Sequence, residues 1–190
     1  MITVVSGLPR SGTSLAMQML AAGGMPVLID GERQADADNP RGYYEWERIK
    51  RLPYEPSCIA EAEGKAVKVI SHLLLTLPDG HDYSVVFMQR PLAEVAASQA
   101  EMIRRRGTTG AALEKAALLS ALQAHLNQIN FWLGKQPHIR TYRLDYQAVI
   151  EQPLKAATML QQFLPALLDP DAMARQVDAS LYRQRQRDFA

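Results

Sequence analysis

The chain has 190 residues, of which 47% are hydrophobic and 22% charged, a composition typical of one globular domain large enough to bury a core. The 21 basic residues nearly balance the 20 acidic ones, and a net charge of +1 offers no general attraction for nucleic acid. Cys58 is the only cysteine, which excludes an internal disulfide and favours a reducing compartment. The apolar stretch 69–78 is too short to cross a bilayer, and the chain opens on a strand pattern without a leader. We therefore expect one cytoplasmic domain over residues 1–190.

The clearest local pattern is a strand, a glycine loop and a helix at the start of the chain. Residues 2–6 are apolar and β-branched, and residues 14–24 have helical spacing and end on two glycines. Residues 30–57 are rich in Gly, Pro, Asn and charges, so we expect a long loop with a short helix around 44–52. A loop of this length is usually functional.

The rest of the chain alternates between strand and helix patterns. Residues 66–70 read as a strand, although the overlapping stretch 69–77 fits a helix as well. The further expected elements are a strand at 83–89, helices at 91–106 and 113–134, a strand at 138–144, a helix from Pro153 to 164, and a helical or irregular tail. This alternation predicts an α/β fold of the P-loop NTPase-like type, with three layers (α/β/α) around a central parallel sheet.

The loop sequence GLPRSGTS is typical of a phosphate site. Gly7 and Gly12 have the G-x-x-x-x-G spacing of a turn whose backbone N–H groups surround an anion at a helix N-terminus. Thr13 stands where nucleotide triphosphatases have a lysine, and the cation of this loop comes earlier, at Arg10. The strand at 83–89 is followed by Arg90 instead of a magnesium-binding carboxylate, which leaves Asp145 as the candidate for that role.

SGLPRSGTSL resembles the 5′-phosphosulfate loop of sulfotransferases, which transfer a sulfuryl group from 3′-phosphoadenosine 5′-phosphosulfate (PAPS). A second match lies in VVFMQRPLAEVAASQAEM, where Arg90 and Ser98 occupy the positions that clasp the 3′-phosphate in that family. DYQAVIEQP is similar to the stretch that places a tyrosine, here Tyr146, near the adenine. The resemblance implies that PAPS is held by residues of the loop and of these two later segments: Pro9, Arg10, Ser11, Gly12, Thr13, Ser14, Arg90, Ser98 and Tyr146.

The resemblance also suggests where a general base lies. His72, in SHLL, matches the segment that carries a base, but it could equally be a packed, hydrogen-bonded histidine. The family's lysine usually stands two residues before it, where this chain has Ile70, and Lys68 can fill that place. Glu45, in RGYYEWE, is the rival base, although a lone glutamate is more often solvated on a helix face.

Other residues have weaker assignments. Tyr43, Tyr44 and Trp46 line an acceptor pocket or anchor the long loop on the core. The arginines at 104–106 and at 183, 185 and 187 are solvated helix ends or attract an anionic acceptor or the 3′-phosphate. The histidines show no spacing that indicates a zinc site.

The sequence thus predicts a PAPS-dependent sulfotransferase acting on a hydroxyl or amine, with Arg10 as the catalytic cation and His72 or Glu45 as the base. PAPS is the co-substrate, and no metal is expected. The expected partners are a small-molecule, glycan or lipid acceptor and neither nucleic acid nor membrane, and a homodimer stays open. The alternatives are a small-molecule kinase that uses ATP and a non-catalytic nucleotide-binding module.

Overall fold

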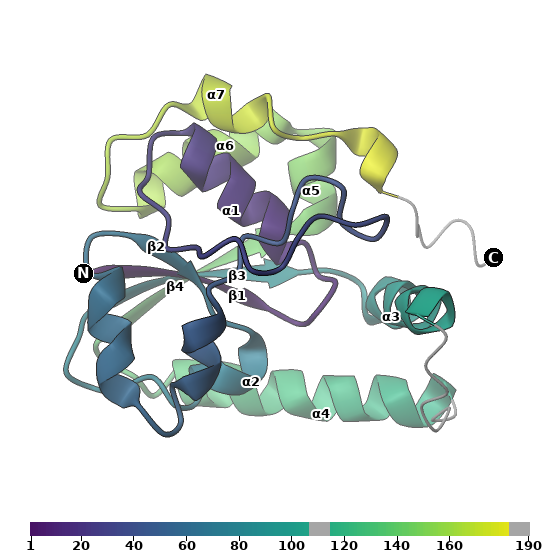
Figure 1. Ribbon diagram of the computed structural model, residues 1–190, viewed down its shortest axis with the longest axis horizontal. Helices are drawn as coiled ribbons and strands as arrows, with labels where there is room; N and C mark the ends of the chain where they lie inside the picture. Colours follow the sequence, from purple (N-terminus) through teal and green to yellow (C-terminus); the bar gives the residue numbers. More distant parts are fainter. Residues whose placement is uncertain (107–114, 183–190) are drawn as a thin grey trace.

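Four parallel strands form the central sheet of the computed structural model, which describes residues 1–106 and 115–182 (Figure 1). The strands lie in the order β2–β1–β3–β4. Their bounds are β1 Ile2–Gly7, β2 Ala66–Lys68, β3 Tyr83–Gln89 and β4 Ile139–Asp145. Strand β1 lies in the middle, where Val4 is in register with Val67 of β2 and Val85 of β3. The glycine loop therefore leaves the sheet near its centre.

Both faces of the sheet are covered, and the side chains that alternate along each strand enter two separate hydrophobic cores. On β3, Val86 belongs to one hydrophobic core, while Val85 and Phe87 belong to the other. Helices cover the two faces (Figure 1). The first core contains residues of α1 Thr13–Ala22, α5 Tyr146–Glu151, α6 Pro153–Phe163 and α7 Pro170–Ala174. The second contains residues of η1 Glu47–Arg51, η2 Pro56–Ala62, α2 Ser71–Leu74 and α4 Lys115–Leu133. The predicted three-layer α/β/α fold is thus confirmed.

Two helices lie past the carboxyl ends of the strands. Helix α3, Leu92–Arg106, follows β3 beyond the sheet edge, and the short 3-10 helix η3, Ala179–Leu181, comes back toward it at the end of the described chain (Figure 1). In such sheets the carboxyl ends of the strands are where ligands bind.

The segments between β1 and β3 differ from the expectation in detail. The expected long loop contains η1 and also the unforeseen η2, and strand β2 ends at Lys68 because α2 begins at Ser71. Ile70 has an extended conformation and is the N-cap of α2, so the helical alternative for residues 69–77 holds only for Ser71–Leu74. The expected start of the long helix at 113 and the arginines at 183, 185 and 187 lie outside the described residues.

Gly12 provides a test of the loop conformation. It has φ 105°, and a Cβ there would lie 2.4 Å from Cδ2 of Tyr146, so Gly12→Ala combines backbone strain with a clash. We expect the free energy of unfolding to fall by about 1–3 kcal/mol, which is roughly 3–10 °C in melting temperature. Gly80→Ala is the matched control, because nothing lies within 4 Å of its added Cβ. Equal melting temperatures for the two variants would contradict this loop geometry.

Candidate functional site

The turn between β1 and α1 directs backbone N–H groups into one cavity. Helix α1 begins at Thr13 with Gly12 as its N-cap and without a side-chain cap. Within residues 1–106 and 115–182, the N–H groups of Thr13, Ser14 and Leu15 have no hydrogen-bond acceptor. The first N–H groups of a helix have no partner inside it, and the helix dipole makes this end positive. The turn is therefore suited to an anion.

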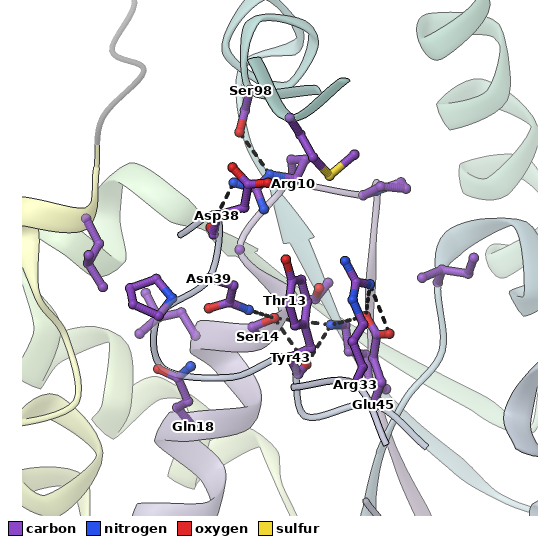
Figure 2. A pocket seen from close by; sticks show the side chains of 18 of the residues that line it. Arg10, Thr13, Ser14, Gln18, Arg33, Asp38, Asn39, Tyr43, Glu45 and Ser98 are labelled. Carbon is purple, nitrogen blue, oxygen red and sulfur yellow. Dashed lines mark hydrogen bonds and ion pairs between the residues drawn. The ribbon is translucent and has the colours of Figure 1, made fainter. Parts of the chain in front are cut away.

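Arg10 holds its guanidinium over this turn. Its backbone is left-handed, with φ 76°, and its Nε donates to Ser98 Oγ at 3.0 Å while Nη2 donates to the Asp38 carbonyl at 3.1 Å (Figure 2). Burial lowers the pKa of Arg10, and the Asp38 carboxylate opposes that shift. The predicted catalytic cation and the predicted 3′-phosphate serine therefore contact each other directly.

A second cation reaches the turn from strand β2. Lys68 is only 6% exposed, and its Nζ donates to Ser14 Oγ at 3.1 Å, to the Tyr43 carbonyl at 2.8 Å and to Glu45 Oε1 at 3.1 Å. Burial lowers the pKa of Lys68, while the Glu45 carboxylate raises it in part. The ammonium has three acceptors for its three hydrogens, which is what a buried lysine needs. Lys68 thus supplies the charge that is missing at Thr13.

The hydroxyl of Ser14 joins the turn to the long loop. Ser14 Oγ donates to the Tyr43 carbonyl at 3.2 Å and accepts from Lys68 and from Asn39 Nδ2 at 2.9 Å (Figure 2). These contacts span 25–54 positions in the sequence. They tie the first turn of α1 to strand β2 and to the segment around Asn39.

Glu45 lies between two cations. Both of its carboxylate oxygens accept from Arg33 Nη1, at 3.0 and 3.1 Å, and Oε1 also accepts from Lys68. Burial by itself would raise the pKa of Glu45, but Lys68 and Arg33 outweigh burial and lower it. Arg33 also stacks on the Tyr43 ring, with its Cζ 3.4 Å from the ring centroid. Glu45 is therefore an ionised pocket carboxylate, not a solvated helix residue.

A charged cluster lies behind the Arg10 end of the turn. Arg90 Nε donates to Glu94 at 2.9 Å and Arg90 Nη1 donates to the Arg10 carbonyl at 3.1 Å. Glu94 is 1% exposed and also accepts from the Tyr182 hydroxyl at 2.7 Å. The Arg90 guanidinium lies 4.8 Å from the Tyr146 ring centroid. Arg90 thus supports the loop and the C-terminal segment in addition to any role toward a ligand.

One cavity of about 380 Å³, a size typical of small-molecule sites, is lined by Arg10, Ser14, Glu45, Lys68 and Arg90, whereas Glu94 and Tyr182 lie behind its wall. Most of the predicted site residues belong to its lining: Pro9, Arg10, Gly12, Thr13, Ser14, Glu45, Arg90, Ser98 and Tyr146. Tyr43 and Trp46 line it too, whereas Tyr44 packs against the first core. The structure thus brings together predicted site residues as distant in the sequence as Pro9 and Tyr146.

Two predicted site residues lie elsewhere. The Ser11 hydroxyl is buried beside a second, smaller cavity, and its N–H donates to the Leu8 carbonyl, so Ser11 offers nothing to the main cavity. His72 is exposed on α2 and does not line the cavity. Its ring stacks on His125, with centroids 4.1 Å apart. The structure therefore separates the two candidate bases, with Glu45 inside the cavity and His72 outside it.

Several lining residues were not singled out from the sequence, among them Arg33, Asp38 and Asn39. They belong to the long loop, whose composition indicated function without indicating which side chains point inward. Arg105, from the arginine run at 104–106, lines the cavity and pairs with the Asp38 carboxylate at 3.0 Å. Its proximity to the cavity could not be read from the run itself.

The described part of the chain has neither a metal-ligand cluster nor a membrane-spanning helix. In it, no three His, Cys, Asp or Glu side chains are grouped so that they could hold a metal ion. None of its helices is both long enough and apolar enough to pass through a membrane.

No family model and no curated protein matches the chain. Among solved structures, a sulfotransferase domain from the curacin biosynthetic pathway has 15% identity and a TM-score of 0.49, over 95% of this chain and 88% of that one. An unliganded sugar kinase from Janibacter sp. HTCC2649 has 15% identity and a TM-score of 0.43, over 93% of this chain and 97% of that one. At these values neither similarity carries an argument about what the present chain does.

Proposed function

We propose that this chain is a sulfotransferase that moves a sulfuryl group from PAPS to an acceptor hydroxyl. The observation that carries the proposal is the 3.1 Å contact between the buried Lys68 ammonium and Ser14 Oγ. In magnesium-dependent P-loop enzymes the hydroxyl at the position of Ser14 coordinates the metal ion. An ammonium bonded to that hydroxyl would repel Mg²⁺ from it, whereas it would attract an anionic phosphosulfate that needs no metal.

The position of Asp145 also supports sulfuryl over phosphoryl transfer. Asp145 is the candidate carboxylate for a kinase, but its side chain caps α5 by accepting from the Ala148 N–H at 2.7 Å. It is not among the residues that line the cavity. The carboxylate that the kinase alternative would use for its metal thus stands at the end of β4 but does not line the cavity.

The loop residues fit the phosphosulfate end of PAPS. The N–H groups of Thr13, Ser14 and Leu15 can bind its 5′-phosphate, with Arg10 and Lys68 beside the sulfuryl oxygens. Ser98 Oγ can turn from Arg10 to a 3′-phosphate. Bound PAPS would supply the activated sulfuryl group, and the protein would contribute position and charge.

The side chains that take part in the reaction all line this cavity. The acceptor oxygen forms a bond to sulfur, the bond from sulfur to the bridging phosphate oxygen breaks, and the electron pair remains on the departing bisphosphate. Arg10 and Lys68 stabilise the charge that develops on that oxygen. The hydroxyl proton passes to the Glu45 carboxylate, which is ionised at neutral pH and lies inside the cavity.

Ligand preference tests this proposal. In a thermal-shift titration, adenosine 3′,5′-bisphosphate should raise the melting temperature equally with EDTA or with Mg²⁺, and more than ADP with Mg²⁺ does. Ser98→Ala should weaken the bisphosphate about threefold to tenfold and leave AMP unchanged, because AMP lacks the 3′-phosphate. Ser120→Ala, on the exposed part of α4, is the matched control. A strong Mg²⁺ requirement with preference for ADP would support a kinase instead. Binding of the bisphosphate without transfer of labelled sulfate to any acceptor would indicate a non-catalytic module.

Arg10 should act mainly in the transition state. We expect Arg10→Ala to lower turnover on the order of 100- to 1,000-fold and to weaken the bisphosphate product much less, because the product lacks the sulfuryl group. Arg10→Lys should restore only part of the rate, because lysine returns the positive charge but lacks the bidentate fork of the guanidinium. Arg140→Ala, an exposed arginine of β4, controls for the loss of charge. Calorimetry of the bisphosphate and transfer of labelled sulfate are the two measurements. If binding is lost while turnover at saturation persists, Arg10 is an anchor.

Glu45 and His72 can be separated by mutation and pH. Glu45→Gln should reduce turnover by at least about 100-fold, whereas His72→Gln should leave it within about twofold. The wild-type rate should stay level as pH falls from 7.5 to 5, because the pKa of Glu45 is lowered from its ordinary value of 4.5 and the carboxylate remains ionised. A rate that instead falls through about pH 6.5, the ordinary pKa of histidine, would contradict the assignment of Glu45.

A further inference from the structure

We infer that the acceptor is a neutral alcohol with an apolar body, bound at the β2 end of the cavity against Trp46, Ile49, Ile70 and Leu73. This inference rests on the proposed sulfotransferase function and names the substrate class of that site. It follows from the strand order, from the composition of the cavity wall and from the charges next to it.

The strand order divides the cavity into two ends. The glycine loop leaves β1, which lies between β2 and β3. Arg90 and Ser98 follow β3 and Tyr146 follows β4, so the predicted nucleotide residues lie on one side of the loop. Lys68 and Ile70 belong to the β2 side. Figure 2 shows Ser14 between these ends, with Arg10 and Ser98 in one direction and the Arg33–Glu45 pair in another.

Four apolar side chains form a wall at the β2 end, beside the exposed Lys50, which also lines the cavity. Trp46 and Ile49 are mostly buried, at 7% and 5% exposure, and line the cavity from the segment that contains η1. Ile70 and Leu73 line it from α2 and its N-cap, and both are half-buried. Apart from the indole N–H of Trp46, these four side chains offer no hydrogen-bonding group. Such a wall binds hydrocarbon better than it binds a polyol.

The charges beside this wall favour a neutral hydroxyl. Lys68 and Arg33 flank Glu45, so the carboxylate already has two cationic partners. An ammonium acceptor would meet an excess of positive charge here, and a carboxylate body would be placed against hydrocarbon. The Lys68 ammonium and Glu45 Oε1 lie 3.1 Å apart, and a hydroxyl that replaces this direct contact accepts from the ammonium and donates to the carboxylate. The reacting oxygen then lies near Ser14, to which Lys68 is also bonded.

The experiment measures the binding of n-alkanols, from butanol to octanol, without nucleotide. The chain has two tryptophans, so Trp132→Phe leaves Trp46 as the fluorescent reporter at the site. Affinity should rise about fourfold for each added methylene group, because each one is transferred from water to the apolar wall. Leu73→Ala should flatten this dependence and Leu73→Glu should abolish binding. Leu167→Ala, at a leucine that is 95% exposed and outside the cavity lining, is the matched control.

Any of three results would overturn the inference. Alkanol affinity would be independent of chain length, or it would be the same in Leu73→Ala as in the wild type, or glucose would bind more tightly than hexanol. Failure of the sulfotransferase proposal looks different, because alkanols would bind as expected while the bisphosphate did not. Where both ligands bind, labelled sulfate from PAPS should be transferred to hexanol with a lower KM than to ethanol. An equal KM for the two alcohols would contradict the acceptor role of this wall.

Discussion

The contact between the Lys68 ammonium and the Ser14 hydroxyl is the constraint on which the site depends. A buried ammonium is costly unless each of its hydrogens has an acceptor. Here the acceptors are Ser14 of the glycine loop and, in the long loop, the Tyr43 carbonyl and Glu45, so the charge holds these two segments against strand β2. The same charge replaces the lysine that the loop lacks and keeps Mg²⁺ away from Ser14 in the mechanism that we propose.

The buried Arg90–Glu94 pair gives the opposite side of the cavity its shape. Glu94 accepts from both Arg90 and the Tyr182 hydroxyl, and Arg90 in turn donates to the Arg10 carbonyl. Removing one member of such a pair leaves a buried charge without its partner, which usually costs more than the pair contributes. The conformation of Arg10 is thereby linked to the C-terminal segment. This explains how an arginine with left-handed backbone is kept at the mouth of an anion site.

The two ends of the cavity have different chemistry because different strands supply them. The end beside β3 and β4 has basic, hydroxyl and aromatic side chains, whereas the end beside β2 has an apolar wall next to Glu45 and its two cationic partners, Arg33 and Lys68. A parallel sheet places its carboxyl ends along one edge, so one loop at the centre of that edge can contact both. In the mechanism that we propose, the sulfuryl donor and the acceptor therefore meet near Ser14 from opposite ends of the cavity.

The sequence by itself determined the alternation of strands and helices, the parallel sheet with two covered faces, and the glycine loop with Arg10 at its side. These features depend on short-range periodicity and on backbone preferences, which neighbouring residues reveal. Only the tertiary structure decided which side chains enter the cavity. Lys68 and Ala66 are two residues apart on β2, so their side chains lie on the same face of the sheet, toward α1. His72 comes four residues after Lys68, on helix α2, and its side chain is exposed. The direction of such a side chain depends on where the strand ends and the helix begins. The pairing of Ser14 with Lys68, or of Arg10 with Ser98, depends on strand order and long-range packing, which spacing along the chain does not encode.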